Sequence, residues 1–178
     1  ISAGDTAWVL VSAAMVLLMT PGLAFLYGGM TRAKSTLNMM MMSLVSIGIV
    51  TVLWVLFGFS ATFGHHNGWL GPISLSNIGA AADSGVAVNG TTPTTIPVLA
   101  FAVFQLTFAI ITTALISGAI ADRTKFSAWC IFAGLWATLV YFPVAHWAFD
   151  FGDATGNGAG WLAARGLQDF AGGTVVEI

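Results

Sequence analysis

Two carboxylates lie in the last apolar stretch of this chain, DFAGGTVVEI. Asp169 opens the stretch, and Glu177 stands among Val175, Val176 and Ile178 with no basic residue in the stretch. A carboxylate in an apolar setting is costly unless it is hydrogen-bonded, paired or protonated, so an acid within a membrane is a functional candidate. Two kinds of chemistry suit such residues: electrostatic support of a cation, and exchange of a proton.

A pair of phenylalanines forms the second set of candidates. Phe104 and Phe108 are four residues apart, so a helix places both rings on one face. An aromatic face attracts a cation by about 0.5–2 kcal/mol, although most phenylalanine pairs in apolar helices serve packing alone. Gln105, beside them, is interpreted as an interhelical hydrogen-bonding residue rather than a ligand.

The remaining candidates for metal or acid–base chemistry favour structural roles. His146 stands near the end of an apolar stretch and is expected to cap the helix or hydrogen-bond locally, and the adjacent His65 and His66 cannot share a helix face. The methionines of Met39–Met42 cover every side of a helix, which does not suit a metal site. The apolar stretches contain no nucleophile–base pair or metal-ligand spacing, which predicts no enzyme activity, no metal and no cofactor.

Composition identifies the medium in which these residues act. Hydrophobic residues make up 57% of the sequence and charged residues 7%, and the mean hydropathy is +0.90, which does not make an ordinary water-facing surface. A helix needs roughly 20 apolar residues to cross a bilayer. Four stretches have that length and a fifth begins, at about 7–30, 37–64, 95–121, 126–149 and 169–178. We predict an all-α protein, a polytopic transmembrane helical bundle with one membrane domain.

The basic residues predict how the bundle is oriented. Four of the five follow the first or the third apolar stretch, and these are Arg32, Lys34, Arg123 and Lys125. By the positive-inside rule their loops are cytoplasmic, which places the N-terminus and the loops at 65–95 and 150–168 outside. The five basic residues form no patch of the kind that binds nucleic acid.

Four segments of the chain resemble the ammonium transporter family, Amt/Mep/Rh. They are, in order, DTAWVLVSAAMVLLMTPGLAFLYGGMTRAKSTLNMMMMS, AFAVFQLTFAIITTALISGAIADRTKFSAW, YFPVAHWAFDFG and DFAGGTVVEI. The resemblance implies a homotrimer of eleven-helix subunits, each with its own pore and with the N-terminus outside. This chain is then expected to be part of such a protein, with the first four helices and the start of the fifth.

The resemblance also implies a role for each candidate. Phe104 and Phe149 bind the cation at an outer site, which Asp169 supports electrostatically. Phe108 forms a gate, and Glu177 lines the pore and handles protons. The chain departs from the family at two of these positions: Phe149 stands where the family usually has Trp, and Glu177 replaces the usual first pore histidine.

These inferences together predict a transport function. The expected activity is the passage of ammonium or methylammonium across the cell (plasma) membrane through a subunit pore, with the lipid bilayer and a cytoplasmic regulatory protein as further partners. The alternative is an ammonium sensor built on the same fold, which would carry a signalling domain after the membrane helices.

Overall fold

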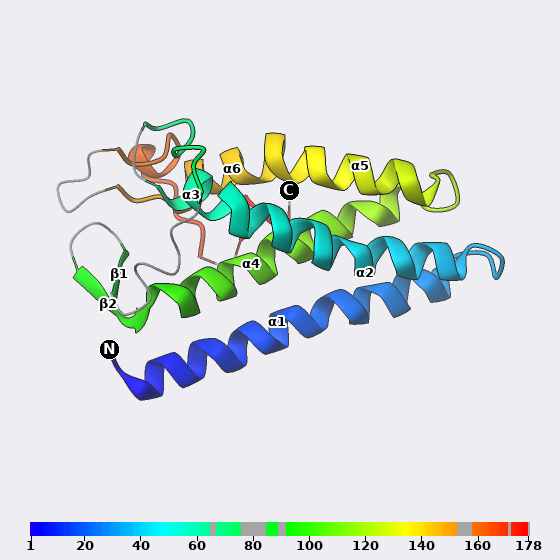
Figure 1. The fold of residues 1–178 in the computed structure, drawn as a ribbon, viewed down its shortest axis with the longest axis horizontal. Coiled ribbons are helices and arrows are strands. Elements are labelled where there is room, and N and C mark those ends of the chain that lie inside the picture. Colours follow the sequence, from blue (N-terminus) through cyan, green and yellow to red (C-terminus); the bar gives the residue numbers. More distant parts are fainter. Residues whose placement is uncertain (65–66, 76–84, 89–91, 153–157, 171, 178) are drawn as a thin grey trace.

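The computed structural model describes residues 1–64, 67–75, 85–88, 92–152, 158–170 and 172–177. Four helices in these ranges have the length and composition to cross a membrane, namely Ala3–Met30, Thr36–Phe63, Val98–Ile120 and Phe126–Phe149. Figure 1 shows them side by side along the long axis of the molecule. The predicted transmembrane helical bundle is confirmed.

The first helix, α1 (Ala3–Met30), runs without interruption although it contains Pro21. Its N-terminus is capped by Ser2, whose hydroxyl accepts a hydrogen bond from the Asp5 N–H at 3.3 Å. The negative charge of Asp5 in the first turn suits the positive end of the helix dipole. α1 packs against α2 (Thr36–Leu53) and α4 (Val98–Leu115).

Two of the four spans each contain one π-helical turn. The second span continues from α2 through the π turn η1 to α3, and the fourth span continues from α5 through the π turn η3 to α6. Their bounds are η1 Trp54–Gly58, α3 Phe59–Phe63, α5 Phe126–Trp136, η3 Ala137–Tyr141 and α6 Phe142–Phe149. A π turn shifts the side chains that follow it around the helix, and such turns are frequent near functional sites.

The third span begins later than predicted because of a proline. Pro97 has an extended backbone (φ −64°, ψ 147°) and precedes α4, which ends in the 3-10 turn η2 (Ile116–Ile120). Before it, β1 (Gly85–Val88) and β2 (Thr92–Pro97) pair as an antiparallel hairpin with an irregularity between Gly85 and Ala87. The sequence predicted only a loop here, since the segment lacks a strand pattern.

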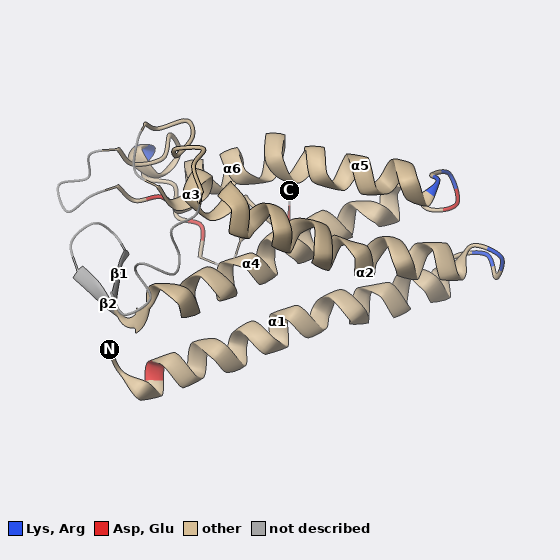
Figure 2. Ribbon diagram, in the orientation of Figure 1, with Lys and Arg blue, Asp and Glu red and all other residues tan. Residues whose placement is uncertain are grey.

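The two ends of the bundle differ in character. The hairpin end comprises the N-terminus, β1–β2, the 67–75 segment and the C-terminal ends of α3 and α6. It also includes the loop at 158–167 with the 3-10 turn η4 (Ala163–Arg165). The basic end comprises the connections at 31–35 and 121–125, with Arg32, Lys34, Arg123 and Lys125. Figure 2 shows Lys and Arg side by side in these two connections. The loops predicted to share one side of the membrane therefore lie at one end of the bundle.

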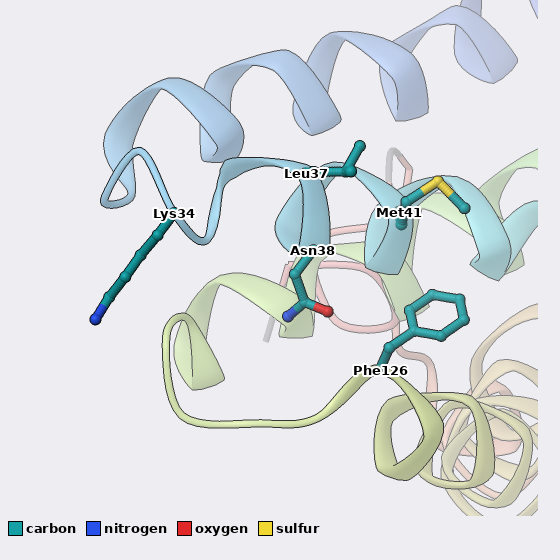
Figure 3. Close-up of a pocket in the computed structure, with 5 residues that line it drawn as sticks. All are labelled: Lys34, Leu37, Asn38, Met41 and Phe126. Carbon is teal, nitrogen blue, oxygen red and sulfur yellow. The ribbon is translucent and has the colours of Figure 1, made fainter.

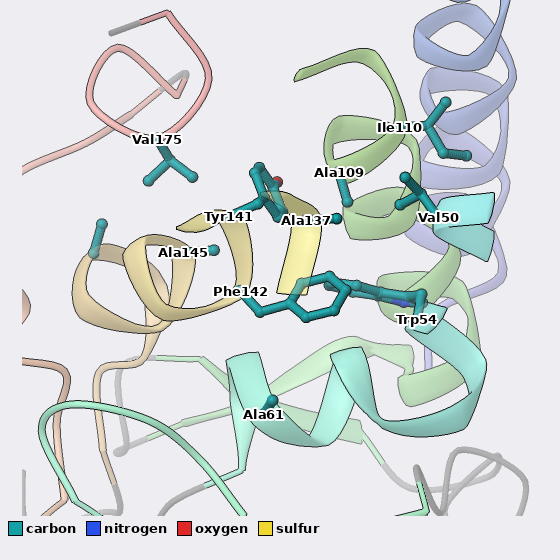
Figure 4. Close-up of a cluster of buried hydrophobic side chains, with 11 residues drawn as sticks. Val50, Trp54, Ala61, Ala109, Ile110, Ala137, Tyr141, Phe142, Ala145 and Val175 are labelled. Atoms are coloured by element: carbon teal, nitrogen blue, oxygen red, sulfur yellow. The ribbon is translucent and has the colours of Figure 1, made fainter. Parts of the chain in front are cut away.

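The largest buried cluster joins the two π turns (Figure 4). Trp54 of η1 and Phe142 of α6 lie 5.7 Å apart between ring centroids, and the Trp54 indole N–H donates to the Ala102 carbonyl of α4 at 3.2 Å. Gly58 makes this approach possible, since a Cβ there would lie 2.5 Å from Phe142 Cζ. The core thus ties the second, third and fourth spans together in the half nearer the hairpin end.

Candidate functional site

The structure places the two phenylalanines of α4 together. The ring centroids of Phe104 and Phe108 are 5.0 Å apart, with the ring planes at 88°, and both side chains are partly buried. The hydroxyls of Thr107 and Thr112 donate to the carbonyls of Phe104 and Phe108, each at 2.6 Å. The shared face predicted from their spacing is confirmed. Because the backbone carbonyls of both residues already accept hydrogen bonds, what the pair offers to a ligand is its aromatic surface.

Phe149 stands apart from this pair. It lies in the last turn of α6, is partly buried and packs against the largest buried cluster. Within the described ranges its ring makes no stacking or edge contact with Phe104 or Phe108. The structure of this chain therefore does not bring the three phenylalanine rings into mutual contact.

Asp169 is held by backbone groups. Its carboxylate accepts from the N–H groups of Gly172 at 2.6 Å, Thr174 at 3.0 Å and Val175 at 3.3 Å. The carboxylate thus caps the N–H groups of the residues that follow it. Because each carboxylate oxygen accepts at least one of these bonds, the backbone holds the Asp169 carboxylate in a defined position.

The segment after Asp169 differs from the prediction, because it forms turns rather than the start of a helix. Gly172 adopts φ +90°, and the N–H groups of Val176 and Glu177 both donate to its carbonyl, at 2.7 and 3.2 Å. Two glycines weaken a helix, and short helical segments are marginal without packing. Three bonds to one carboxylate stabilise the turns instead.

This arrangement also changes the surroundings of Glu177. Val175 is buried in the largest cluster (Figure 4), whereas Glu177 is exposed in this chain. Because the predicted start of a fifth helix does not form here, Glu177 is not drawn into that cluster. Its carboxylate has no hydrogen-bond partner among the residues described.

A buried histidine–aspartate pair lies next to Phe149, and sequence reasoning missed it. His146 is fully buried in α6, with Nδ1 2.8 Å from the Thr62 carbonyl and Nε2 2.7 Å from the Asn67 carbonyl. Asp150 Oδ2 lies 3.5 Å from Nδ1. The expectation of local contacts holds only for Asp150, four residues away, since the two hydrogen-bonding carbonyls are 84 and 79 residues away. The signal that could have found the pair is the i, i+4 spacing of His and Asp across a helix end.

Backbone and indole hydrogen bonds fasten the same region. The Trp147 indole N–H donates to the Trp69 carbonyl at 2.7 Å, and the Trp161 N–H donates to the Gly68 carbonyl at 2.7 Å. The rings of Trp69 and Trp161 stack at 5.4 Å, and the Arg165 guanidinium lies 4.6 Å from the centre of the Trp161 ring. These contacts join the 67–70 turn, the end of α6 and the 158–165 loop into one cap.

The basic end holds a cavity of about 390 Å³ that is separate from these residues. Five side chains from two neighbouring segments line it, and they are Lys34, Leu37, Asn38, Met41 and Phe126. Figure 3 shows Lys34 directed away from Asn38 and Phe126. Over the described part of the chain, no group of three or more His, Cys, Asp and Glu side chains is placed to hold a metal ion, and His65 and His66 lie outside that part.

Comparison with known proteins shows to which family this chain belongs. The family model described as Ammonium Transporter Family matches residues 7–178, which include every candidate named above. An ammonium transporter of Mycobacterium tuberculosis is 56% identical over 188 residues, which cover 98% of this chain and 39% of the relative. The chain belongs to the ammonium transporter family.

Solved structures related to this family member share its fold. The crystal structure of Saccharomyces cerevisiae Mep2 matches with a TM-score of 0.80 at 31% identity, over 99% of this chain and 37% of that one. A sensor Amt protein matches with a TM-score of 0.78 at 26% identity, over 97% of this chain and 40% of that one. The chain thus spans about two fifths of the length of these proteins, and it is an integral membrane segment of a transporter family.

Proposed function

We propose that the protein containing this chain passes ammonium or methylammonium across a membrane through a pore within each subunit. Family membership over residues 7–178 carries the proposal, and the edge-to-face pair of Phe104 and Phe108 supports it. Ammonium in water is a cation, and a bare charge at the membrane centre costs several kcal/mol. An aromatic capture site followed by a narrow gate meets this demand, because it selects the cation before its charge is shed or carried separately.

Each candidate residue has a role in this proposal. Phe104 and Phe149 offer ring faces to the cation, and Phe108 closes the path below them. Asp169 strengthens the attraction through its charge, since its oxygens are engaged by backbone N–H groups. Glu177 lines the pore and exchanges protons, which an acid in an otherwise apolar stretch can do.

The setting of the protein follows from the same proposal. The four basic residues of the basic end face the cytoplasm, so the N-terminus lies outside the plasma membrane. Subunits assemble as a homotrimer, and a cytoplasmic protein regulates transport from the basic end. These statements rest on the charge distribution of the chain and on its family.

Reconstitution of the full-length protein tests the proposal. Proteoliposomes containing it, adsorbed on a supported membrane, are expected to give currents when ammonium or methylammonium is added, and much smaller currents with potassium. Empty liposomes provide the control. Equal currents for ammonium and potassium would contradict the proposal. So would the absence of labelled methylammonium uptake above that of empty liposomes.

Ammonium sensing is the second candidate, and the likeness to a sensor Amt protein favours it. A sensor must bind ammonium at the outer site but has no need to pass it at a useful rate. Saturable ammonium binding to the purified protein with no methylammonium uptake would support sensing. Binding together with uptake would support transport.

A further inference from the structure

The hydrogen bonds of His146 define its charge. Each ring nitrogen faces a backbone carbonyl oxygen, that of Thr62 at 2.8 Å and that of Asn67 at 2.7 Å. A carbonyl oxygen only accepts hydrogen bonds, so both ring nitrogens must donate. A neutral imidazole has one N–H, and only the imidazolium form has two. The two hydrogen bonds therefore require the His146 ring to be protonated on both nitrogens, which makes it a cation.

Asp150 provides the opposite charge that a buried cation needs. It is 2% exposed, and its Oδ2 lies 3.5 Å from His146 Nδ1, while its Oδ1 accepts from the Gly152 N–H at 3.0 Å. An isolated buried charge is very costly, whereas a hydrogen-bonded pair is tolerated. The segments packed around the ring, 59–63, 67–70 and 158–162, contain no ionisable side chain.

His146 and Asp150 also hold the backbone at the end of α6, where Phe149 lies between them. Phe149 lies three residues after His146 and directly before Asp150, whose N–H donates to the His146 carbonyl at 3.2 Å. The Asp150 carbonyl in turn accepts from the Gly160 N–H at 2.8 Å. A Cβ at Gly160 would lie 2.0 Å from the His146 carbonyl oxygen, so the 158–162 segment crosses the end of α6 in direct contact.

We propose that His146 is a positioning residue: as a buried imidazolium paired with Asp150, it fastens the end of α6 to Thr62 and Asn67 and so aims the Phe149 ring at the outer cation site. The effect on Phe149 rests on the proposed function, whereas the charge of His146 does not. His146 itself does not touch the cation in this account.

The first experiment measures the charge directly. Full-length protein with ¹⁵N-labelled histidine is studied in lipid by solid-state NMR at neutral pH, and the His146 signals are assigned by their absence from His146→Asn. We expect two protonated ring nitrogens in the unaltered protein and one in Asp150→Asn, because the ring then gives up its uncompensated charge. One protonated nitrogen in the unaltered protein would overturn the proposal, whatever the protein transports.

The second experiment tests whether the pair acts through Phe149. Asp150→Asn is expected to raise the half-saturating ammonium concentration about threefold, the order expected when a cation–π contact is weakened, with a smaller change in maximal current. In a Phe149→Ala background the same substitution should change that concentration no further. Asp5→Asn is the matched control, since this acid lies at the same end, is exposed and accepts a hydrogen bond from the Thr95 hydroxyl.

The outcomes separate this inference from the proposed function. An equal shift in the presence and absence of the Phe149 ring would show that the pair acts on stability alone and would reject the positioning role. If Asp150→Asn fails to fold, the same comparison is made with Asp150→Glu, which keeps the charge and is expected to preserve the doubly protonated ring. Loss of the two protonated nitrogens in Asp150→Glu would count against pairing.

Discussion

The hairpin end and the basic end of this bundle are built by different means. At the hairpin end, contacts such as that between His146 and Thr62 join residues about 80 positions apart in the sequence. At the basic end, the contacts between the two connections are also distant in sequence but longer in space, as where the Asn38 side-chain amide lies 3.4 Å from the Thr124 carbonyl. The ion pair between Arg32 and Asp122 there spans 4.0 Å, with the Arg32 side chain 76% exposed and the Asp122 side chain 29% exposed.

This difference shows which end of the molecule depends on precisely placed contacts and which depends mainly on charge. Buried polar groups are tolerated when all their partners are in place, so the hairpin end depends on several segments meeting correctly. Basic residues that bias the orientation of a membrane protein act through their number and side, and an exposed ion pair such as Arg32–Asp122 depends less on precise geometry. Substitutions should therefore have strong effects near the hairpin end and weak effects at the basic end.

The largest effect is expected from Phe108→Ala in the full-length protein. Removal of the gate ring leaves a void that admits water and hydrated ions, so the ammonium-to-potassium current ratio should fall by about tenfold or more, given the cost of a charge that is no longer excluded. Phe132→Ala, which removes a partly exposed ring of α5, is the control. An unchanged ratio in Phe108→Ala would show that Phe108 is not the gate.

Glu177 is expected to affect proton handling. Glu177→Leu should strongly reduce ammonium-evoked currents because the pore loses a proton-exchanging group, and Glu177→His should move the pH dependence of the currents because imidazole exchanges protons over another pH range. Asp122→Asn, at the basic end, should leave the profile as it is. Superimposable profiles and amplitudes for all variants would show that Glu177 does not exchange protons during transport.

Paired glycine substitutions test the comparison of the two ends through stability. Gly160→Ala should lower the free energy of unfolding by about 1–3 kcal/mol, since the new Cβ meets the His146 carbonyl oxygen at 2.0 Å. Gly29→Ala, near the basic end, has no atom within 4 Å of its Cβ and should be neutral or stabilising by up to about 1 kcal/mol. Denaturant titration in detergent micelles measures both, and equal losses would contradict the contrast.

A smaller effect is expected from Phe149→Trp, which restores the residue usual in the family. The larger indole ring attracts a cation more strongly, so the half-saturating ammonium concentration should fall, by about fivefold at most for a gain of about 1 kcal/mol. Phe170→Trp alters a ring that is 91% exposed and should have no effect. An unchanged concentration in Phe149→Trp would remove Phe149 from the outer site.

The smallest effect is expected at the basic end, from Arg32→Gln. The Arg32 side chain is 76% exposed, and ion pairs of this kind contribute about 0–1 kcal/mol, less in salt. The thermal unfolding midpoint should therefore stay within the error of unaltered protein at physiological salt. A clear drop would mean that the basic end is held by specific geometry, as the hairpin end is.

Much of the bundle could be predicted because its signals are local. Apolar length alone predicts the four spans, and the i, i+4 spacing places Phe104 and Phe108 on one face whatever surrounds them. The third span was predicted to begin at about residue 95, whereas the helix begins at Val98. Residues up to Pro97 belong to the strand β2 instead.

The sequence by itself determined the membrane setting, the helical spans and the gathering of four basic residues at one end of the bundle, because hydropathy and charge act residue by residue. Only the tertiary structure decided the partners of His146, the turns after Asp169 and the exposure of Glu177. These features depend on whether distant segments offer a carbonyl, a charge or a packing surface at the right place. The physical reason is that a buried polar group is satisfied by whatever lies beside it in space, which the order of residues along the chain does not specify.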